Sequence, residues 1–247
     1  MGARRVVRDP KVNARHSGME RTQVRAVIAE LLATEARFHG LTPVQEVDWS
    51  LNREALDLLV DLTADATETL ETGVGYSTVV FAAFATHHTV VSPFAFEHDR
   101  VRRWCTERDI DTDEIEFVAK PSQEVLPALD PTPLDLVLID GDHAFPAPFI
   151  DFYYAAGRLA PGGVLVVDDT QLRPCRLLAD FLETESERWR LHTKLTMTTA
   201  FERLDGPLIP LTGWGSQPWS AEPLAPSNVT PKRSLRARIG ARAHRSR

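Results

Sequence analysis

Two hydrophobic periods alternate along the chain, and together they predict an α/β fold. Apolar residues recur at helical spacing over about residues 19–39 and 52–62. Short apolar runs typical of buried strands then alternate with helical stretches from residue 68 onward. We expect strands at 68–72, 89–92, 115–118, 134–140 and 163–169, and helices at 79–85, 100–108, 122–128, 148–159 and 176–187. Such repeated strand–helix units predict a doubly wound, mostly parallel sheet, preceded by N-terminal helices.

The two ends of the chain differ from this body. Residues 1–18 are basic and lack periodicity, so we expect a flexible arm. Residues 206–247 carry six prolines between Gly206 and Pro231, a spacing that predicts neither helix nor central strand, and then a basic tail expected to be disordered. The folded domain is therefore predicted at 19–205, including two N-terminal helices that could pair subunits in a homo-oligomer.

Composition narrows the class of protein. A chain of 247 residues with 43% hydrophobic residues can bury a substantial core, and two cysteines exclude a disulfide scaffold. It has neither a membrane-spanning apolar stretch nor a secretory signal, so we expect a cytoplasmic protein without a membrane partner. The net charge of −7 averages basic ends of +5 (1–25) and +7 (232–247) with a body of −19. An acidic body argues against nucleic acid as the partner.

Candidate chemistry begins at a glycine turn after the first predicted strand. Parallel sheets bind ligands beyond the carboxyl ends of their strands. The chain there reads Glu71-Thr-Gly73-Val-Gly75-Tyr-Ser-Thr, and the two glycines let the backbone turn sharply and approach a ligand. Thr78 stands where the dinucleotide pattern has its third glycine, and no phosphate-binding Gly-Lys-Ser/Thr follows. A tight turn without a ligand remains the alternative.

Carboxylates end two later strands. Asp140-Gly-Asp-His143 follows one strand, and Asp168-Asp169 follows the next. If these strands are neighbours, three carboxylates converge and repel one another. A divalent cation such as Mg²⁺, Mn²⁺ or Ca²⁺ would compensate, since these ions prefer oxygen ligands. The alternative is that the acids only cap the following helices.

The segment from Glu71 to Thr78 resembles motif I of class I S-adenosylmethionine-dependent methyltransferases, which have a Rossmann-like fold. With the carboxylates, the chain over about residues 50–200 is most similar to methyltransferase family 24, a branch of metal-dependent O-methyltransferases that act on macrolide sugars and other natural products. The resemblance implies S-adenosylmethionine as cofactor. It places Glu71, Gly73, Gly75, Ser77 and Thr78 around the methionine part of that cofactor.

The same resemblance assigns the rest of the site. Ser92 stands in place of the family's ribose-binding acid and can still hydrogen-bond a ribose hydroxyl, and Glu97, five residues on, is a second candidate for this contact. Ser122 and Gln123 are candidates for the adenine contact, although Ser122 could instead cap a helix. Asp140, near the cofactor, would bind Mg²⁺ or Mn²⁺ with Asp168 and Asp169. His143 would be the base, removing the proton of a hydroxyl on a small molecule such as a sugar or phenol.

Other functions stay open at this point. One is an NAD(P)-dependent oxidoreductase on a similar sheet. A second is a non-catalytic binding module, and a third is an RNA methyltransferase that uses the basic ends. Among the remaining residues, Trp49, Trp104 and Trp189 are expected in the core or in a lid. His87 and His88 are expected before the second strand, away from the ligand.

Overall fold

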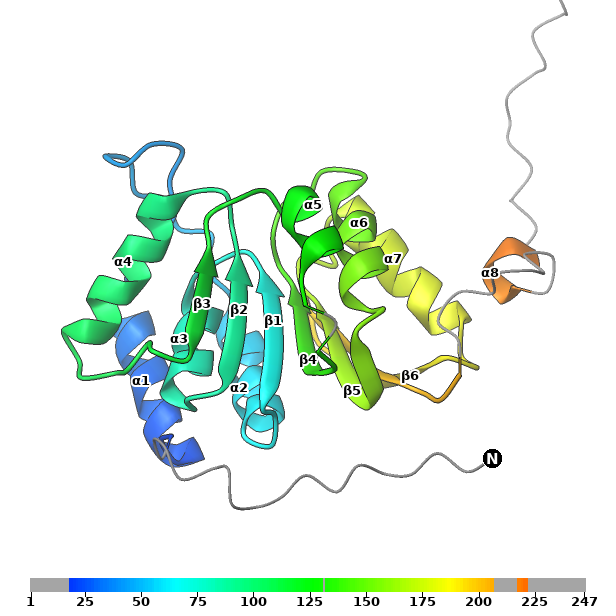
Figure 1. Cartoon of the computed structure of the whole chain (residues 1–247), viewed down its shortest axis with the longest axis horizontal. Coiled ribbons are helices and arrows are strands. Elements are labelled where there is room, and N and C mark those ends of the chain that lie inside the picture. Colours follow the sequence, from blue (N-terminus) through cyan, green and yellow to red (C-terminus); the bar gives the residue numbers. More distant parts are fainter. Residues whose placement is uncertain (1–17, 131, 207–216, 222–247) are drawn as a thin grey trace, which may run out of the picture.

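The computed structural model describes residues 18–130, 132–206 and 217–221, and its centre is a seven-stranded sheet (Figure 1). The strands are β1 (Glu68–Thr72), β2 (His87–Val91), β3 (Ile115–Val118), β4 (Leu134–Ile139), β5 (Leu159–Val167), β6 (Trp189–Lys194) and β7 (Thr199–Arg203). Their order is β3-β2-β1-β4-β5-β7-β6. The first five run parallel, and β7 pairs antiparallel with both β5 and β6. The predicted mostly parallel, doubly wound sheet is confirmed.

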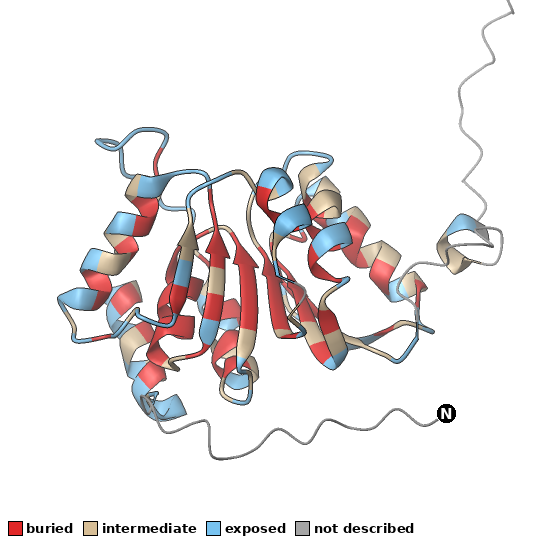
Figure 2. Ribbon diagram, viewed as in Figure 1, coloured by how far each residue is buried: buried red, intermediate tan, exposed pale blue. Residues whose placement is uncertain are grey.

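Helices cover both faces of this sheet. They are α1 (Arg21–Thr34), α2 (Arg53–Thr63), α3 (Tyr76–Ala83), α4 (Ala95–Thr106), α5 (Ser122–Val125), α6 (Ala147–Ala155), α7 (Arg173–Thr184) and α8 (Pro218–Ala221), with a 3₁₀ turn at Leu126–Ala128. Successive side chains of β4 point to opposite faces. Leu136 and Leu138 pack in the core under α1–α4, whereas Val137 and Ile139 pack in the core under α6 and α7. Burial on both faces explains the nearly continuous apolar run of this strand (Figure 2).

Three expectations need correction. Strands β6 and β7, which form an antiparallel pair, were not predicted, because β6 is a largely exposed edge strand with a polar sequence. His87 and His88 lie inside β2, not before it. The proline-rich segment does contain a helix, α8, because Pro218 occupies its first position, where no backbone N–H is needed. Trp219 of this helix packs its ring 5.8 Å from that of Phe181 in α7.

Other expectations about the chain ends lie outside the described residues. The arm at 1–18 is described only at residue 18, and the segment 206–247 only at 206 and 217–221. Within the described part of the chain, no helix has the length and apolar character needed to cross a membrane.

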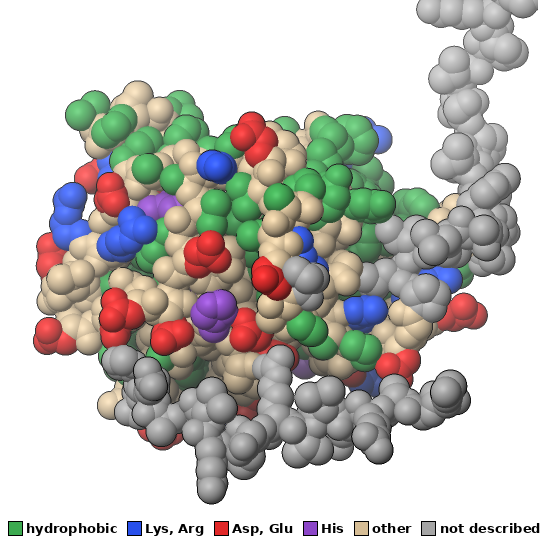
Figure 3. Space-filling model, viewed as in Figure 1, with side chains coloured by type: hydrophobic (Ala, Val, Ile, Leu, Met, Phe, Trp, Pro, Cys, Tyr) green, Lys and Arg blue, Asp and Glu red, His purple; other side chains and the backbone are tan. Residues whose placement is uncertain are grey.

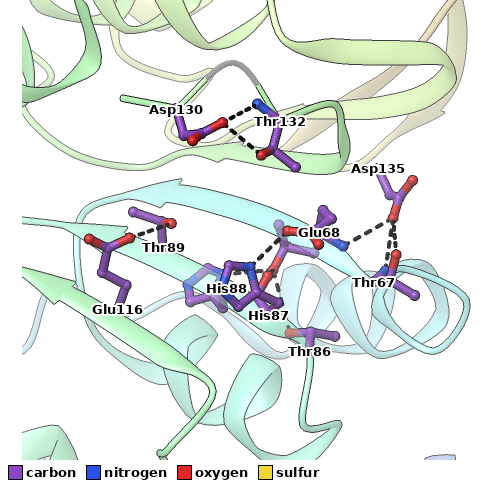
Figure 4. Close-up of polar contacts among 11 residues, drawn as sticks. Thr67, Glu68, Thr86, His87, His88, Thr89, Glu116, Asp130, Thr132 and Asp135 are labelled. Atoms are coloured by element: carbon purple, nitrogen blue, oxygen red, sulfur yellow. Dashed lines mark hydrogen bonds and ion pairs between the residues drawn. The ribbon is translucent and has the colours of Figure 1, made fainter. Parts of the chain in front are cut away.

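The amino ends of the strands carry a polar clasp (Figure 4). Asp135 of β4 accepts three hydrogen bonds on one oxygen, from the Thr67 backbone (2.9 Å), the Thr67 hydroxyl (2.8 Å) and the Glu68 backbone (3.0 Å). The Glu68 carboxylate also lies 2.7 Å from Nδ1 of His87 in β2. These contacts join three neighbouring strands at the end opposite to the ligand edge, so we assign them to stability.

Asp135→Ala should therefore lower the free energy of unfolding by about 2 kcal/mol, because it removes a charged acceptor from three donors. Urea unfolding would measure the loss. Asp135→Asn keeps one acceptor oxygen and should cost less. An Ala variant as stable as the wild type would contradict the role assigned to this side chain.

Candidate functional site

A cavity of about 670 Å³ opens at the carboxyl ends of the parallel strands. The strands end in register there, with Thr72 of β1 beside Val91 and Ile139, and Ile139 beside Val167. Residues that follow these strands consequently lie next to one another around the cavity. The predicted location of the ligand site at this edge agrees with the position of the cavity.

Most of the residues selected from the sequence line this cavity. They are Gly73, Ser92, Glu97, Ser122, Gln123, Asp140, His143, Asp168 and Asp169. Four others, Glu71, Gly75, Ser77 and Thr78, are buried and do not line it. The lining also includes residues that the sequence did not single out as ligands, among them His39, Trp49, Thr72, Leu172 and Met197. Trp104 and Trp189 are buried, whereas Trp49 is 55% exposed at the cavity.

The glycine turn requires glycine at residue 73. Gly73 has φ +99°, and a Cβ there would lie 2.2 Å from the carbonyl oxygen of Asp140. The turn thus packs directly against the backbone that follows β4. Helix α3 begins immediately after Gly75, so its N-terminal N–H groups face this edge of the sheet.

Glu71 supports this turn from inside the protein. Its side chain is fully buried, Thr78 Oγ1 donates to its Oε1, and the Gly75 N–H donates to Thr78 Oγ1 (3.0 Å). His88 Nε2 lies 3.1 Å from the same carboxylate oxygen. The other oxygen, Oε2, has no hydrogen-bond partner among the described residues. Glu71 therefore contacts the turn residues, with one buried oxygen free.

The partnership of His88 with Glu71 was missed from the sequence. The His88 ring is fully buried, stacks on Phe81 at 4.0 Å and contacts the Thr69 hydroxyl through Nδ1 (2.8 Å). A signal was present, because His88 precedes buried Val90 by two residues and must share its face once both are placed in one strand.

A second corner of the cavity is built around Glu97 in the first turn of α4. Its Oε2 accepts from the Ser92 hydroxyl (3.3 Å), and its Oε1 accepts from the Gly40 N–H (3.1 Å). His39 Nδ1 lies 3.7 Å from Oε1. The structure thus brings a carboxylate from residue 97 to the strand end where the sequence has Ser92. The contribution of residues 39 and 40 was not predicted.

Ser122 does not cap a helix. The residue at the N-cap of α5 is Pro121, and no side chain makes a capping hydrogen bond there. Ser122 lines the cavity with Gln123 instead. Behind it lies Asp151 of α6, which is 1% exposed, and burial raises the pKa of its carboxyl group.

An acid–histidine cluster occupies the third side of the cavity. β4 and β5 are neighbours, as assumed from the sequence, and their ends bring Asp140, His143 and Asp169 together with ligand atoms within 4.8 Å of one another. His143 Nε2 lies 2.8 Å from Asp169 Oδ2. Asp168 is only 5% exposed and accepts a hydrogen bond from Thr198. The atoms that converge thus include those of His143 and not those of Asp168.

The charges of this cluster are strongly coupled. Burial, together with the nearby Asp168, raises the pKa of Asp140 well above its usual value, and burial raises that of Asp168 to about 6. The hydrogen bond with His143 lowers the pKa of Asp169. Burial alone would lower the pKa of His143, but hydrogen bonds with Asp169 and Cys175 and the charge of Asp140 raise it to about 10. Without a bound cation, His143 and Asp169 form an ion pair beside two carboxyl groups that hold protons easily.

A comparison with family models matches residues 70–170 to methyltransferase family 24, described as a methyltransferase domain. The matched segment begins in β1 and ends just after Asp169, so it includes the glycine turn and the acid–histidine cluster. No curated protein matches the chain.

Solved structures share the fold at low sequence identity. The O-methyltransferase TomG from Streptomyces achromogenes, in complex with SAM, has a TM-score of 0.55 and 19% identity, covering 76% of this chain and 100% of TomG. Cofactor-bound Rv0187 from MTB has a TM-score of 0.56 and 19% identity, and the match covers 74% of this chain and 91% of Rv0187. A candidate rRNA methylase from Clostridium thermocellum has a TM-score of 0.51 and 13% identity, and the match covers 64% of this chain and 99% of the methylase. These likenesses establish the fold, which serves different methyl acceptors.

Proposed function

We propose that this chain, whose residues 70–170 form a methyltransferase domain of the class I fold, transfers a methyl group from S-adenosylmethionine to a hydroxyl oxygen of a small molecule. The observation that carries the proposal is the single cavity that joins three parts: the glycine turn, the Glu97 corner and the acid–histidine cluster. The first two suit the methyl donor. The third suits deprotonation of an acceptor.

The donor would lie along the glycine turn and the Glu97 corner. S-adenosylmethionine carries positive charge on its sulfonium and ammonium groups and has no phosphate. The residues lining this cavity suit such a ligand, because they include carboxylates and, apart from His39 and His143, no basic side chain. The Glu97 carboxylate would accept hydrogen bonds from ribose hydroxyls. Ser122 and Gln123 are the candidates for the adenine end.

The acceptor hydroxyl would lie beside His143. His143 takes the hydroxyl proton as the oxygen bonds to the methyl carbon, and the carbon–sulfur bond breaks, leaving S-adenosylhomocysteine. Asp169 orients the His143 ring through Nε2, and Cys175 Sγ lies 3.7 Å from Nδ1 on the other side. This proton transfer requires a neutral imidazole, so His143 would first lose its Nδ1 proton while its Nε2–H still donates to Asp169.

The cluster also fits a divalent cation. Asp140 and Asp169 supply oxygen donors, with His143 or Asp168 as the third group, and such donors suit Mg²⁺ or Mn²⁺. Mg²⁺ or Mn²⁺ held there would acidify the acceptor hydroxyl and neutralise Asp169. This is our proposal for the cofactor set: S-adenosylmethionine with Mg²⁺ or Mn²⁺.

Small molecules are the acceptors that the charge pattern favours. On the face drawn in Figure 3, acidic and basic side chains of the described residues are interspersed, without one continuous basic patch. Nucleic-acid surfaces carry such patches because phosphate contacts dominate affinity. Trp49, Leu172 and Met197 instead give the cavity an apolar side.

Equilibrium binding tests this function directly. We expect S-adenosylhomocysteine to bind the purified chain at one site, and NADH not to bind, in isothermal titration calorimetry. Binding of NADH alone would overturn the proposal in favour of an oxidoreductase. Transfer of a radiolabelled methyl group to a panel of sugars, phenols and RNA then separates the acceptor classes, and labelling of RNA alone would overturn the small-molecule part.

Gly73→Ala should abolish most donor binding, because a Cβ at residue 73 meets backbone and φ is positive. Strain of this kind costs about 1–3 kcal/mol, so we expect affinity for S-adenosylhomocysteine to fall about tenfold or more. Gly162→Ala is the matched control: φ is +85° there, yet no atom lies within 4 Å of the added methyl group. Equal affinities of the two variants would contradict a donor site at this turn.

A further inference from the structure

The segment between α1 and α2 forms a strap across the ligand edge of the sheet. We define the strap as residues 38–50, drawn in blue beside α4 in Figure 1. A bridge between His39 and Val47 closes it, with the Val47 N–H donating to the His39 carbonyl (3.0 Å). His39, Trp49 and Ser50 line the cavity. The strap therefore forms part of the wall of the site.

The Arg100 side chain of α4 hydrogen-bonds to two separate parts of the strap. Arg100 Nη1 donates to the carbonyls of Phe38 (3.0 Å) and His39 (2.9 Å). Its Nη2 donates to the carbonyls of Pro43 (2.9 Å) and Gln45 (3.0 Å). A planar guanidinium can reach four acceptors in this way, whereas a lysine ammonium cannot span them. Arg100 thus holds four backbone carbonyls of the strap with one side chain.

The strap also contacts both parts of the proposed donor site. The Gly40 N–H donates to Glu97, which lies one helical turn before Arg100 and faces the cavity. The His39 ring lies against the glycine turn, since a Cβ at Gly75 would be 3.1 Å from His39 Nε2. A ligand that occupies the Glu97 corner consequently shares a carboxylate with the strap.

We infer that Arg100 is a positioning residue. Through Arg100, binding of the donor is coupled to the position of the strap, and with it to the position of Trp49 on the cavity wall. This inference rests on the proposed function, because the ligand at Glu97 is taken to be the ribose of the donor. Hydroxyls bound to Glu97 hold its carboxylate in the orientation that also accepts from Gly40. Donor binding then stabilises the strap, and the fastened strap in turn strengthens donor binding.

Hydrogen–deuterium exchange with S-adenosylhomocysteine tests this coupling. In the wild type we expect the ligand to slow exchange of the Gly40 and Val47 amides. Arg100→Ala should weaken binding of S-adenosylhomocysteine about tenfold, equivalent to about 1.4 kcal/mol, and abolish the ligand-dependent protection of the strap. Arg103→Ala is the matched control and should behave as the wild type, because Arg103 is an exposed arginine of the same helix whose side chain makes no hydrogen bond or ion pair with the described residues.

Two further readouts separate positioning from folding. Arg100→Lys keeps the charge and the alkyl stem, so it should fold and still bind more weakly than Arg103→Ala. If Arg100→Ala does not fold, the inference is tested by comparing the affinity of Arg100→Lys for S-adenosylhomocysteine with that of Arg103→Ala. A fluorescence change on ligand binding that is lost in Trp49→Phe and reduced in Arg100→Lys would show that Trp49 follows the strap.

The outcomes are distinct. A wild type that does not bind S-adenosylhomocysteine overturns the proposed function and the inference with it. A wild type that binds, with the same affinity and strap exchange in the Arg100 variants as in Arg103→Ala, overturns the inference alone.

Discussion

Asp169→Asn is expected to lower the rate of methyl transfer about a thousandfold while affinity for S-adenosylhomocysteine stays near that of the wild type. The Asp169 carboxylate lies 2.8 Å from His143 and within 4.8 Å of the ligand atoms of Asp140 and His143. Asparagine keeps the shape but removes the charge that would hold a cation and orient the imidazole. Loss of such preorganised electrostatics costs about a factor of 10²–10³ or more in rate.

Removal of the metal from the wild type should also stop methyl transfer. EDTA should abolish turnover of the wild type, and Mg²⁺ or Mn²⁺ should restore it. Asp180→Asn removes one acidic charge of α7 that is paired with Arg176 and does not belong to the cluster, so it serves as control. Full activity of Asp169→Asn in the presence of EDTA would refute the metal proposal.

Asp168→Asn discriminates between two sets of ligands. The family resemblance implies Asp140, Asp168 and Asp169, whereas the geometry brings Asp140, His143 and Asp169 together. Asp168 instead accepts a hydrogen bond from Thr198 in the turn before β7. If Asp168 is a ligand, its variant should need much more Mn²⁺ for half-maximal activity. If it only fixes the loop, the requirement for Mn²⁺ should stay close to that of the wild type.

The sheet was predictable because its parallel strands are buried on both faces. Strands such as β4 are nearly continuous apolar runs, and glycines, prolines or charged residues mark their ends. β6 could not be found as a buried apolar run, because this edge strand exposes most of its side chains. Its sequence, Trp-Arg-Leu-His-Thr-Lys, does alternate apolar and polar residues over the first four positions, and this signal was missed. Its pairing with β7 is a local hairpin in which Lys194 lies opposite Thr199. The attachment of this hairpin to β5, through pairs such as Val167 and Thr199, joins residues that are distant in the sequence and that local patterns do not connect.

The cavity was predictable mainly where its residues follow the parallel strands. Gly73, Asp140 and Asp168 do so, and parallel register brings them to one edge. Glu97 was found as a substitute for Ser92 by proximity in sequence. His39 and Arg100 were not found, because the strap reaches the site from a different part of the chain, and its hydrogen bonds use backbone carbonyls that have no signature in the sequence.

His143→Gln should also lower kcat about a thousandfold, the range expected when a general base is removed together with its electrostatic contribution. Affinity for S-adenosylhomocysteine should change little, since His143 lies in the acid–histidine cluster and not at the glycine turn or the Glu97 corner. A large loss of that affinity would mean that the substitution disturbs the cavity as a whole. Initial rates over a range of S-adenosylmethionine concentrations separate the two effects on kcat and KM.

The same residue can act as a base or as a metal ligand, and the two roles predict different behaviour. A base that has been removed can be replaced by free imidazole, so His143→Ala should recover part of its activity in imidazole buffer while its Mn²⁺ requirement stays unchanged. A removed ligand instead weakens metal binding, about tenfold or more, and imidazole does not restore the rate. The 2.8 Å contact with Asp169 fits both roles, because a cation bound by Asp169 can free the imidazole or bind it. We expect rescue by imidazole, since Asp168 remains nearby as a third carboxylate donor. The absence of rescue, together with a raised Mn²⁺ requirement, would assign His143 to the metal and leave the base to another group.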